Sequence, residues 1–84
     1  MKNIEVLSLS FNKITTLKAI ENCTKLRELY IRKNSIKDIK EIKYLAKCPS
    51  LSVLWFSENP CSDRKDYRLF IIKQLPNLIK LDNK

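Results

Sequence analysis

One short motif occurs three times in this chain, and its spacing limits the possible folds. Each copy reads apolar-x-x-apolar-x-apolar-x-x-Asn, and the copies occupy residues 4–12, 26–34 and 51–59, with a partial fourth copy at 78–82. Self-similarity at such an interval is typical of solenoids, in which each repeat buries its apolar side chains against its neighbours. We therefore expect a single domain over residues 1–84, built from repeats 4–25, 26–50 and 51–77 and a closing strand at 78–82.

Within each copy, apolar residues alternate with other residues, which predicts a strand with one side facing the core. The asparagine that ends each copy is expected to face inward, where its amide bonds loop backbone groups that lack a sheet partner. These residues are Asn12, Asn34 and Asn59. In the second repeat, the apolar stripe of Ile39, Ile42 and Leu45 predicts a true short helix over residues 38–47.

The last part of the chain changes from strand periodicity to helix periodicity. Tyr67, Phe70, Ile71 and Leu75 fall on one helical face. Ser62 or Asp63 is a candidate N-cap, and Pro76 ends the helix, so we expect a helix at about 63–75 that caps the array together with the closing strand. The first strand has no comparable cap. We therefore expect a piece of a longer array, whose open edge at residues 4–10 can pair with another copy.

The composition argues against several classes of function. The chain has no histidine and no glycine, so the commonest catalytic base, the commonest metal ligand and a permissive phosphate loop are missing. We expect no enzyme activity, no cofactor and no metal. Cys23, Cys48 and Cys61 are interpreted as buried structural thiols rather than a zinc site.

Charge and hydropathy bear on location and partners. No apolar run approaches the ~20 residues that a membrane span needs, and no signal peptide precedes the first repeat. This predicts a cytoplasmic or nuclear setting without a membrane partner. The net charge of +8 is compatible with a nucleic-acid partner. The basic residues are dispersed, however, so a solvated surface explains them at least as well and makes nucleic acid the less favoured partner.

The outward positions of neighbouring strands should form columns on the free face of the sheet, which we call the concave face. Tyr30 and Trp55 are unexpectedly large for outward positions, and aromatic residues and arginine dominate binding hot spots. Alternatively, the two rings stack on each other and shield the sheet, and both interpretations can hold together. The candidate partner-binding residues are Val6, Ser8, Ser10, Glu28, Tyr30, Arg32, Val53, Trp55 and Ser57.

The repeats resemble the short SDS22-type leucine-rich repeat. The segment ENPCSDRKDYRLFIIKQLPNLIKLDN is similar to the cap motif of that family, in which Asn-Pro leads through Tyr-Arg to Leu-Pro-x-Leu-x-x-Leu-Asp. The cap positions that match are Tyr67, Arg68, Pro76, Leu78, Leu81 and Asp82. The resemblance implies an α/β leucine-rich-repeat solenoid, with a short parallel sheet on the concave face, helices or 3-10 turns on the convex face, and a C-terminal cap helix.

Within that group, LSLSFNKITTL, LRELYIRKNSI and VLWFSENPC resemble the repeats of cilia- and flagella-associated leucine-rich-repeat proteins of basal bodies. This resemblance implies a non-enzymatic adaptor for ciliary or centrosomal protein partners, located in the cytoplasm at a basal body, a cilium or the cytoskeleton. Two alternatives from the same group remain. One is an RNA-protein scaffold like the spliceosomal U2 A-prime protein, and the other is a regulatory repeat protein of the protein phosphatase 1 type.

Overall fold

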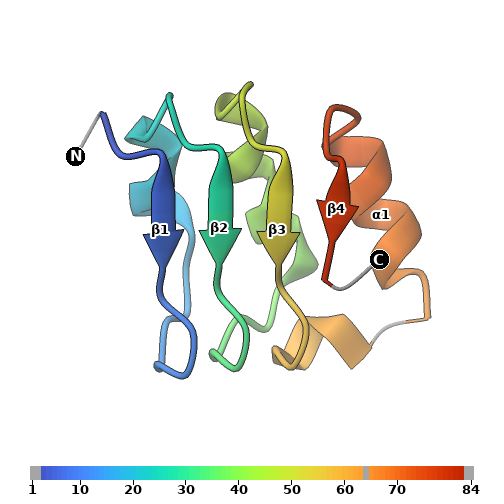
Figure 1. Ribbon diagram of the computed structural model, residues 1–84. Helices are drawn as coiled ribbons and strands as arrows, with labels where there is room; N and C mark the ends of the chain where they lie inside the picture. Colours follow the sequence, from blue (N-terminus) through green and yellow to red (C-terminus); the bar gives the residue numbers. More distant parts are fainter. Residues whose placement is uncertain (1–2, 64, 83–84) are drawn as a thin grey trace.

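Four short parallel strands form one sheet in the computed structural model, which describes residues 3–63 and 65–82. They lie side by side in sequence order (Figure 1). The first residues of the four strands are aligned across the sheet, namely Val6, Glu28, Val53 and Lys80. The strands are β1 (Val6–Ser8), β2 (Glu28–Tyr30), β3 (Val53–Trp55) and β4 (Lys80–Leu81).

All helical segments of the described residues lie on one side of this sheet, behind the strands in Figure 1. They comprise three 3-10 helices and one α-helix, namely η1 (Lys18–Asn22), η2 (Ile39–Lys47), η3 (Pro60–Asp63) and α1 (Tyr67–Gln74). One sheet layer backed by 3-10 helices and a final α-helix confirms the predicted α/β solenoid.

The predicted helix over residues 38–47 is present, but the prediction of a true α-helix was wrong. The segment is a 3-10 helix, Ile39–Lys47, with Asp38 as its N-cap. Its buried residues recur at every third position, as Ile39, Ile42 and Leu45. A helix with three residues per turn places such residues on one line, whereas an α-helix would rotate them away from the core. The 3-10 form therefore buries the complete stripe.

The inward residues of the second and third coils form the centre of the core. Leu29, Ile31, Leu54 and Phe56 are completely buried between the sheet and the 3-10 helices. The equivalent residues of the first coil are only partly buried, because among the described residues only one coil packs against them. This peripheral set is Ile4, Leu7, Leu9 and Ile14.

The three asparagines occupy equivalent turns but differ in burial. Asn34 and Asn59 are buried, and each amide nitrogen donates to carbonyls of its own coil and of the preceding coil. The side-chain oxygen of Asn34 accepts a hydrogen bond from the backbone N–H of Ile14, and that of Asn59 accepts one from the backbone N–H of Ile36. Asn12 donates to carbonyls of its own loop but is exposed, contrary to its expected inward position, because no described coil covers that side.

The cap helix begins later than expected. In place of a helix over about 63–75, the chain forms the 3-10 helix η3 and then α1 at Tyr67–Gln74, while residue 64 lies outside the described residues. Ser62 does not cap α1, because its hydroxyl bonds back to the N–H and carbonyl of Asn59. The residue at the N-cap position is Asp66, and the closing strand is limited to β4.

All three cysteines are buried as thiols, with no disulfide in the described chain. Cys23 and Cys48 end η1 and η2 at equivalent positions, and the Cys48 thiol donates to the Ile20 carbonyl at 3.6 Å. Burial, with a smaller contribution from nearby Cys23, raises the pKa of the Cys48 thiol. Within residues 3–63 and 65–82, no helix has the length and apolar character needed to cross a bilayer.

Candidate functional site

The concave face carries one aromatic pair at its centre. The rings of Tyr30 and Trp55 project from neighbouring strands at paired positions, with centroids 6.1 Å apart and planes tilted by 52°. Both side chains are half-buried. Tilted rings at this separation attract each other. The pair therefore covers the sheet and also presents aromatic surface to solvent, so the two interpretations of these residues are compatible.

Glu28 holds the Tyr30 ring in place. The Tyr30 hydroxyl donates to Glu28 Oε1 at 2.6 Å, from the residue two positions earlier on the same face of β2. This bond, together with the negative charge of Glu28 and some burial, raises the pKa of Tyr30. A fixed aromatic ring loses little conformational entropy when a partner binds, which favours its use as an anchor.

A charged rim lies at the carboxyl ends of the strands. Arg32 Nε donates to Glu58 Oε1 at 2.8 Å, and Lys33 Nζ lies 3.7 Å from Glu58 Oε2. Beside them, the Phe11 ring is 66 % exposed and lies 5.7 Å from the Arg32 guanidinium carbon and 5.2 Å from Lys33 Nζ. An exposed ring in contact with two cations is well suited to contact a protein partner.

The backbone of this rim is unusual. Phe11, Lys33 and Glu58 have φ values of 61°, 52° and 63°, at the same position of three successive coils. Left-handed backbone costs a residue other than glycine roughly 1–2 kcal/mol. Because the chain has no glycine, these turns are made with larger side chains, which the turn directs to the rim.

The other sequence-derived candidates lie on the same face but differ in exposure. Val6 is 54 % exposed and Ser8 is exposed, while Ser10, Val53 and Ser57 are half-buried. The structure adds Lys80 of β4, which is exposed beside Val53 and which the sequence analysis missed. The partial fourth motif contained the necessary signal, because it aligns Lys80 with Val53.

The cap residues cover the end of the sheet that lies beyond β3. The carboxylate oxygen Asp82 Oδ1 accepts from the N–H groups of Phe56 and Ser57 at 2.8 and 2.9 Å. In the preceding coil, the equivalent N–H of Ile31 instead donates to the Trp55 carbonyl. Asp82 therefore replaces the carbonyl that a further coil would provide.

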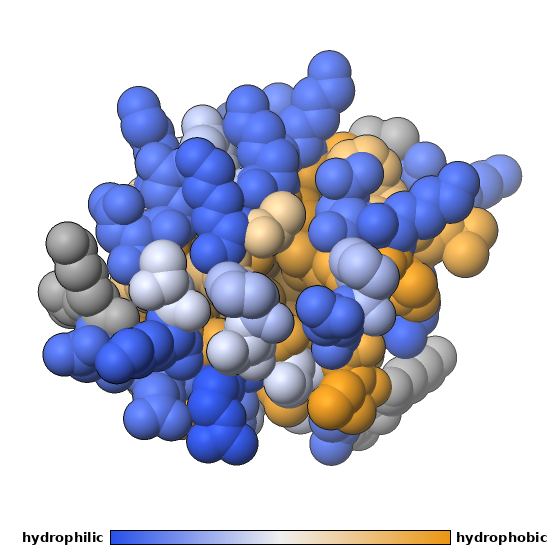
Figure 2. All heavy atoms as spheres, turned by 90° about the horizontal axis from the view of Figure 1, so that it is seen from above, coloured by the Kyte–Doolittle hydropathy of each residue, from blue (hydrophilic) through white to orange (hydrophobic). Residues whose placement is uncertain are grey.

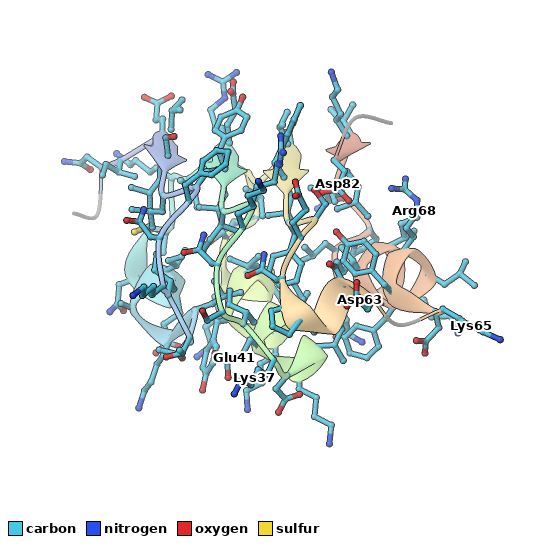
Figure 3. The ribbon with its side chains drawn as sticks, turned by 90° about the horizontal axis from the view of Figure 1, so that it is seen from below. Lys37, Glu41, Asp63, Lys65, Arg68 and Asp82 are labelled. Carbon is cyan, nitrogen blue, oxygen red and sulfur yellow. The ribbon has the colours of Figure 1, made fainter. Side chains whose placement is uncertain are left out.

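Two residues of α1 hold the Asp82 side chain. The Tyr67 hydroxyl donates to Asp82 Oδ2 at 2.7 Å, and the Tyr67 ring stacks on Phe56. Arg68 Nη1 donates to the Leu81 carbonyl and lies 3.9 Å from Asp82 Oδ2, and Figure 3 shows Arg68 and Asp82 close together at the cap. Burial, then the bond to Asp82, raises the pKa of Tyr67 far above its ordinary value.

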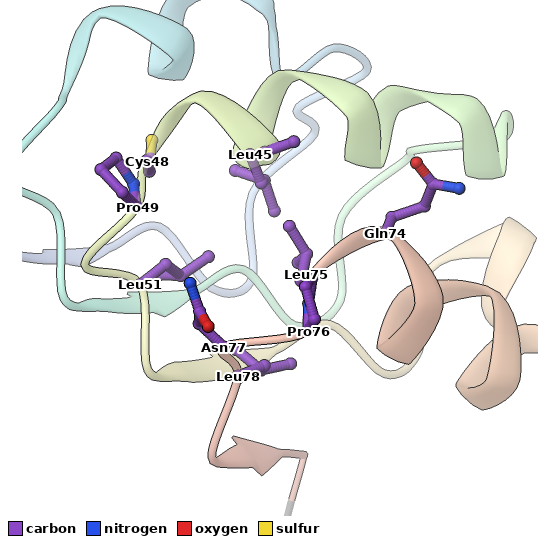
Figure 4. Close-up of a pocket in the computed structure, with 10 residues that line it drawn as sticks. Leu45, Cys48, Pro49, Leu51, Gln74, Leu75, Pro76, Asn77 and Leu78 are labelled. Carbon is purple, nitrogen blue, oxygen red and sulfur yellow. The ribbon is translucent and has the colours of Figure 1, made fainter.

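Pro76 and Leu78, the remaining cap candidates, line a small cavity between the end of η2 and the turn after α1 (Figure 4). Its volume is about 50 Å³. Small-molecule sites usually measure roughly 300–1,000 Å³, so this cavity is too small for one. Within the described residues no group of three or more acidic, cysteine or histidine side chains is placed to hold a metal.

The amino ends of the strands have a different surface. Seen from above in Figure 2, this end is mostly hydrophilic, and apolar side chains gather on the side of α1 and β4. The exposed large apolar residues of the cap are Leu69 and Ile72 of α1, together with Ile79 before β4. Apolar surface is thus exposed on the cap as well as on the concave face.

A family model for leucine-rich repeats, in two copies, matches residues 2–44 and 26–66. Cilia- and flagella-associated protein 410 of Homo sapiens is 45 % identical over 85 residues, which cover 99 % of this chain and 33 % of that protein. The U2 small nuclear ribonucleoprotein A' of Schizosaccharomyces pombe is 32 % identical over 87 residues, covering 98 % of this chain and 35 % of that protein. The chain thus spans about a third of the length of these curated relatives.

Among solved structures, the crystal structure of the Drosophila melanogaster SNF/U2A' complex contains a chain with the same fold. The match covers 96 % of this chain and 48 % of the Drosophila structure's chain, with a TM-score of 0.86 and 22 % sequence identity. The repeat motif, the parallel sheet and the family model agree. The chain belongs to the leucine-rich-repeat family and resembles cilia- and flagella-associated protein 410 over nearly its whole length.

Proposed function

We propose that this chain is a non-enzymatic module that binds a protein partner on its concave face. The observation that carries the proposal is the Tyr30–Trp55 pair, in which the Tyr30 hydroxyl is bonded to Glu28 and both rings are partly open to solvent. Large aromatic residues beside an arginine are the usual anchors of protein interfaces. Leucine-rich-repeat proteins commonly act as interaction modules, and the exposed Phe11 extends the aromatic surface to the rim.

We further propose that the partner is a ciliary or centrosomal protein and that the chain works in the cytoplasm at a cilium, a basal body or the cytoskeleton. This rests on the similarity to cilia- and flagella-associated protein 410 of human and mouse, at 45 % and 44 % identity. The segment VLWFSENPC, on which the resemblance to that family partly rests, includes Trp55, the residue on which the binding proposal depends.

The test uses Trp55→Ala, with Tyr44→Ala as the matched control. Tyr44 is also a half-buried aromatic residue, but it belongs to η2 on the opposite side of the sheet. The unmodified chain is used to capture proteins from an extract of ciliated cells, and affinity for the purified partner is then measured by calorimetry. We expect Trp55→Ala to weaken binding by about 2 kcal/mol or more, since it removes an interface anchor.

Tyr44→Ala should leave the affinity unchanged, and circular dichroism should show that both variants remain folded. Equal affinity of the Trp55→Ala chain and the unmodified chain would refute binding at this face. Unfolding of the Trp55→Ala chain would show instead that Trp55 is part of the core, and would also contradict the proposal.

A second candidate function, an RNA-protein scaffold, is favoured by the net charge of +8 and by the similarity to the U2 small nuclear ribonucleoprotein A'. Phosphate contacts make nucleic-acid affinity fall steeply with salt. Binding of RNA oligonucleotides with such a salt dependence, combined with no effect of Trp55→Ala on captured proteins, would favour this function over the protein-binding proposal.

A further inference from the structure

The cap helix α1 is apolar on two sides. Tyr67, Ile71 and Leu75 point into the core and are almost completely buried. On the other side, Leu69 is 67 % exposed and Ile72 is 48 % exposed. A helix at the surface of a monomer normally has a polar outer side. The outer side of α1 therefore has the character of a contact surface.

At the edge of this outer side, where the half-buried Phe70 also packs against the core, lies a shallow hollow of about 240 Å³. It is lined by Asp66, Leu69, Phe70 and Lys73, which are spaced as i, i+3, i+4 and i+7 along the helix. That spacing places all four side chains in one stripe. The stripe has an acidic residue at its amino end, two apolar residues in the middle and a basic residue at its carboxyl end.

Two copies of this stripe are complementary to each other when they run in opposite directions. If two copies of the stripe are laid antiparallel about a two-fold axis between Leu69 and Phe70, each Leu69 faces the Phe70 of the other copy. The same axis places each Asp66 opposite the Lys73 of the other copy, so both ends meet an opposite charge. A two-fold interface requires this kind of self-complementarity.

We propose that α1 is a dimerisation surface, and that its occupant is a second copy of this chain bound antiparallel through the stripe 66, 69, 70 and 73. The apolar side chains involved are few, and stable interfaces bury roughly 800 Å² on each partner, so the dimer is weak, with Kd on the order of 100 µM. Because α1 lies beside β4 at the end of the array (Figure 1), away from Tyr30 and Trp55, the dimer leaves both concave faces open to partners.

A charge exchange tests the arrangement directly by sedimentation velocity between about 10 µM and 1 mM, a range that brackets the expected Kd. In a dimer of Asp66→Lys chains, both ends of the stripe bring two lysines together. In a dimer of Lys73→Asp chains, both ends bring two aspartates together. We expect each variant alone to dimerise about tenfold more weakly than the unmodified chain.

An equimolar mixture of the two variants should recover dimerisation, because every lysine of one chain then faces an aspartate of the other. A contact elsewhere on the molecule predicts neither the loss in the single variants nor the recovery. A parallel stripe also predicts recovery in the mixture, but it places like charges together in the unmodified chain, so it predicts no weakening of either variant alone; a single variant that dimerises as well as the unmodified chain would therefore exclude the antiparallel arrangement. Thermal melts confirm that each variant is folded. A mixture that associates no better than its components would overturn the proposal.

Leu69→Glu should abolish dimerisation, and Ile79→Glu is the matched control, because Ile79 is 80 % exposed on the cap but lies outside α1. If the Leu69→Glu chain still dimerised like the unmodified chain, the contact would lie elsewhere, for example at the edge of β1, and the proposal would be wrong. A monomer for the unmodified chain at 1 mM, about ten times the expected Kd, would also refute it.

Discussion

At the scale of single residues, the asparagine of each turn stabilises the array to an extent that depends on its burial. Asn59 is 2 % exposed, and its amide bonds the carbonyls of Ile31 and Phe56 and the N–H of Ile36 at 3.0, 2.9 and 3.3 Å. Asn12 holds the equivalent turn of the first coil but is exposed, so water can replace its bonds. Two asparagines in the same motif should therefore differ greatly in their contribution to stability.

We expect Asn59→Ala to lower the free energy of unfolding by about 3–5 kcal/mol, because it leaves buried backbone groups without partners. Asn12→Ala should cost about 1 kcal/mol or less, since the groups it releases are solvated. Urea unfolding followed by circular dichroism measures both values. Similar losses in the two variants would show that burial does not decide the role of this asparagine.

At the scale of the elements, α1 and β4 act together as a substitute for a further coil. Asp82 supplies the acceptor that the N–H of Phe56 would otherwise find in a neighbouring strand, it also accepts from the N–H of Ser57, and the Tyr67 hydroxyl donates to the same carboxylate. The bond requires a protonated phenol, so the stability of the cap depends on pH.

The unfolded chain releases the Tyr67 proton near its ordinary pKa of 10.0, whereas the folded chain retains it because the pKa is raised. The contribution of Tyr67 to stability is therefore complete below about pH 10 and decreases as the pH rises above it. We expect the free energy of unfolding, measured with urea between pH 8 and about 11.5, to fall less steeply for Tyr67→Phe than for the unmodified chain.

Tyr44→Phe serves as the control in that measurement, because Tyr44 lies on η2, away from Asp82. The raised pKa of Cys48 adds a separate loss above about pH 9 in all of these chains, so it cancels in the comparison. If the free energy of unfolding of the Tyr67→Phe chain fell with pH as steeply as that of the unmodified chain, the assigned role of the Tyr67–Asp82 bond would be contradicted.

At the scale of the whole molecule, the strand side of the first coil is packed less completely than that of the second and third coils. The inward side chains of β1 and its flanks, Ile4, Leu7, Leu9 and Ile14, are only partly buried, although Leu17 on the returning arm of the same coil is completely buried; the equivalent side chains of the second coil are completely buried. In a solenoid each coil is stabilised mainly by its neighbours, so local opening is expected to start where a coil has fewer of them.

Hydrogen exchange measured by NMR provides the test at this scale. The N–H groups of Leu9 and Phe11 bond the second strand just as those of Ile31 and Lys33 bond the third, with distances between 2.7 and 3.2 Å. We expect the first pair to exchange about tenfold faster or more, because opening the first coil exposes less apolar surface. Equal protection of both pairs would mean that the array opens as one unit.

Most of the fold could be predicted because a repeat motif carries the same local information three times. The alternation in residues 4–12, 26–34 and 51–59 predicted the strands and the columns of the concave face, including the pairing of Tyr30 with Trp55, and the resemblance to leucine-rich repeats implied the parallel sheet. The type of the convex helices was not predicted, although the period of three in Ile39, Ile42 and Leu45 favours a 3-10 helix over an α-helix.

The repeat pattern specifies which side chains face the core, because inward and outward positions follow from backbone periodicity alone. It does not specify how the array ends, because that depends on contacts between residues far apart in the sequence. The start of α1 at Tyr67, the acceptor role of Asp82, the exposure of Asn12 and the outward position of Leu69 all belong to this second group. Each is determined by whether another coil is present to pack against it, which only the folded arrangement of the coils establishes.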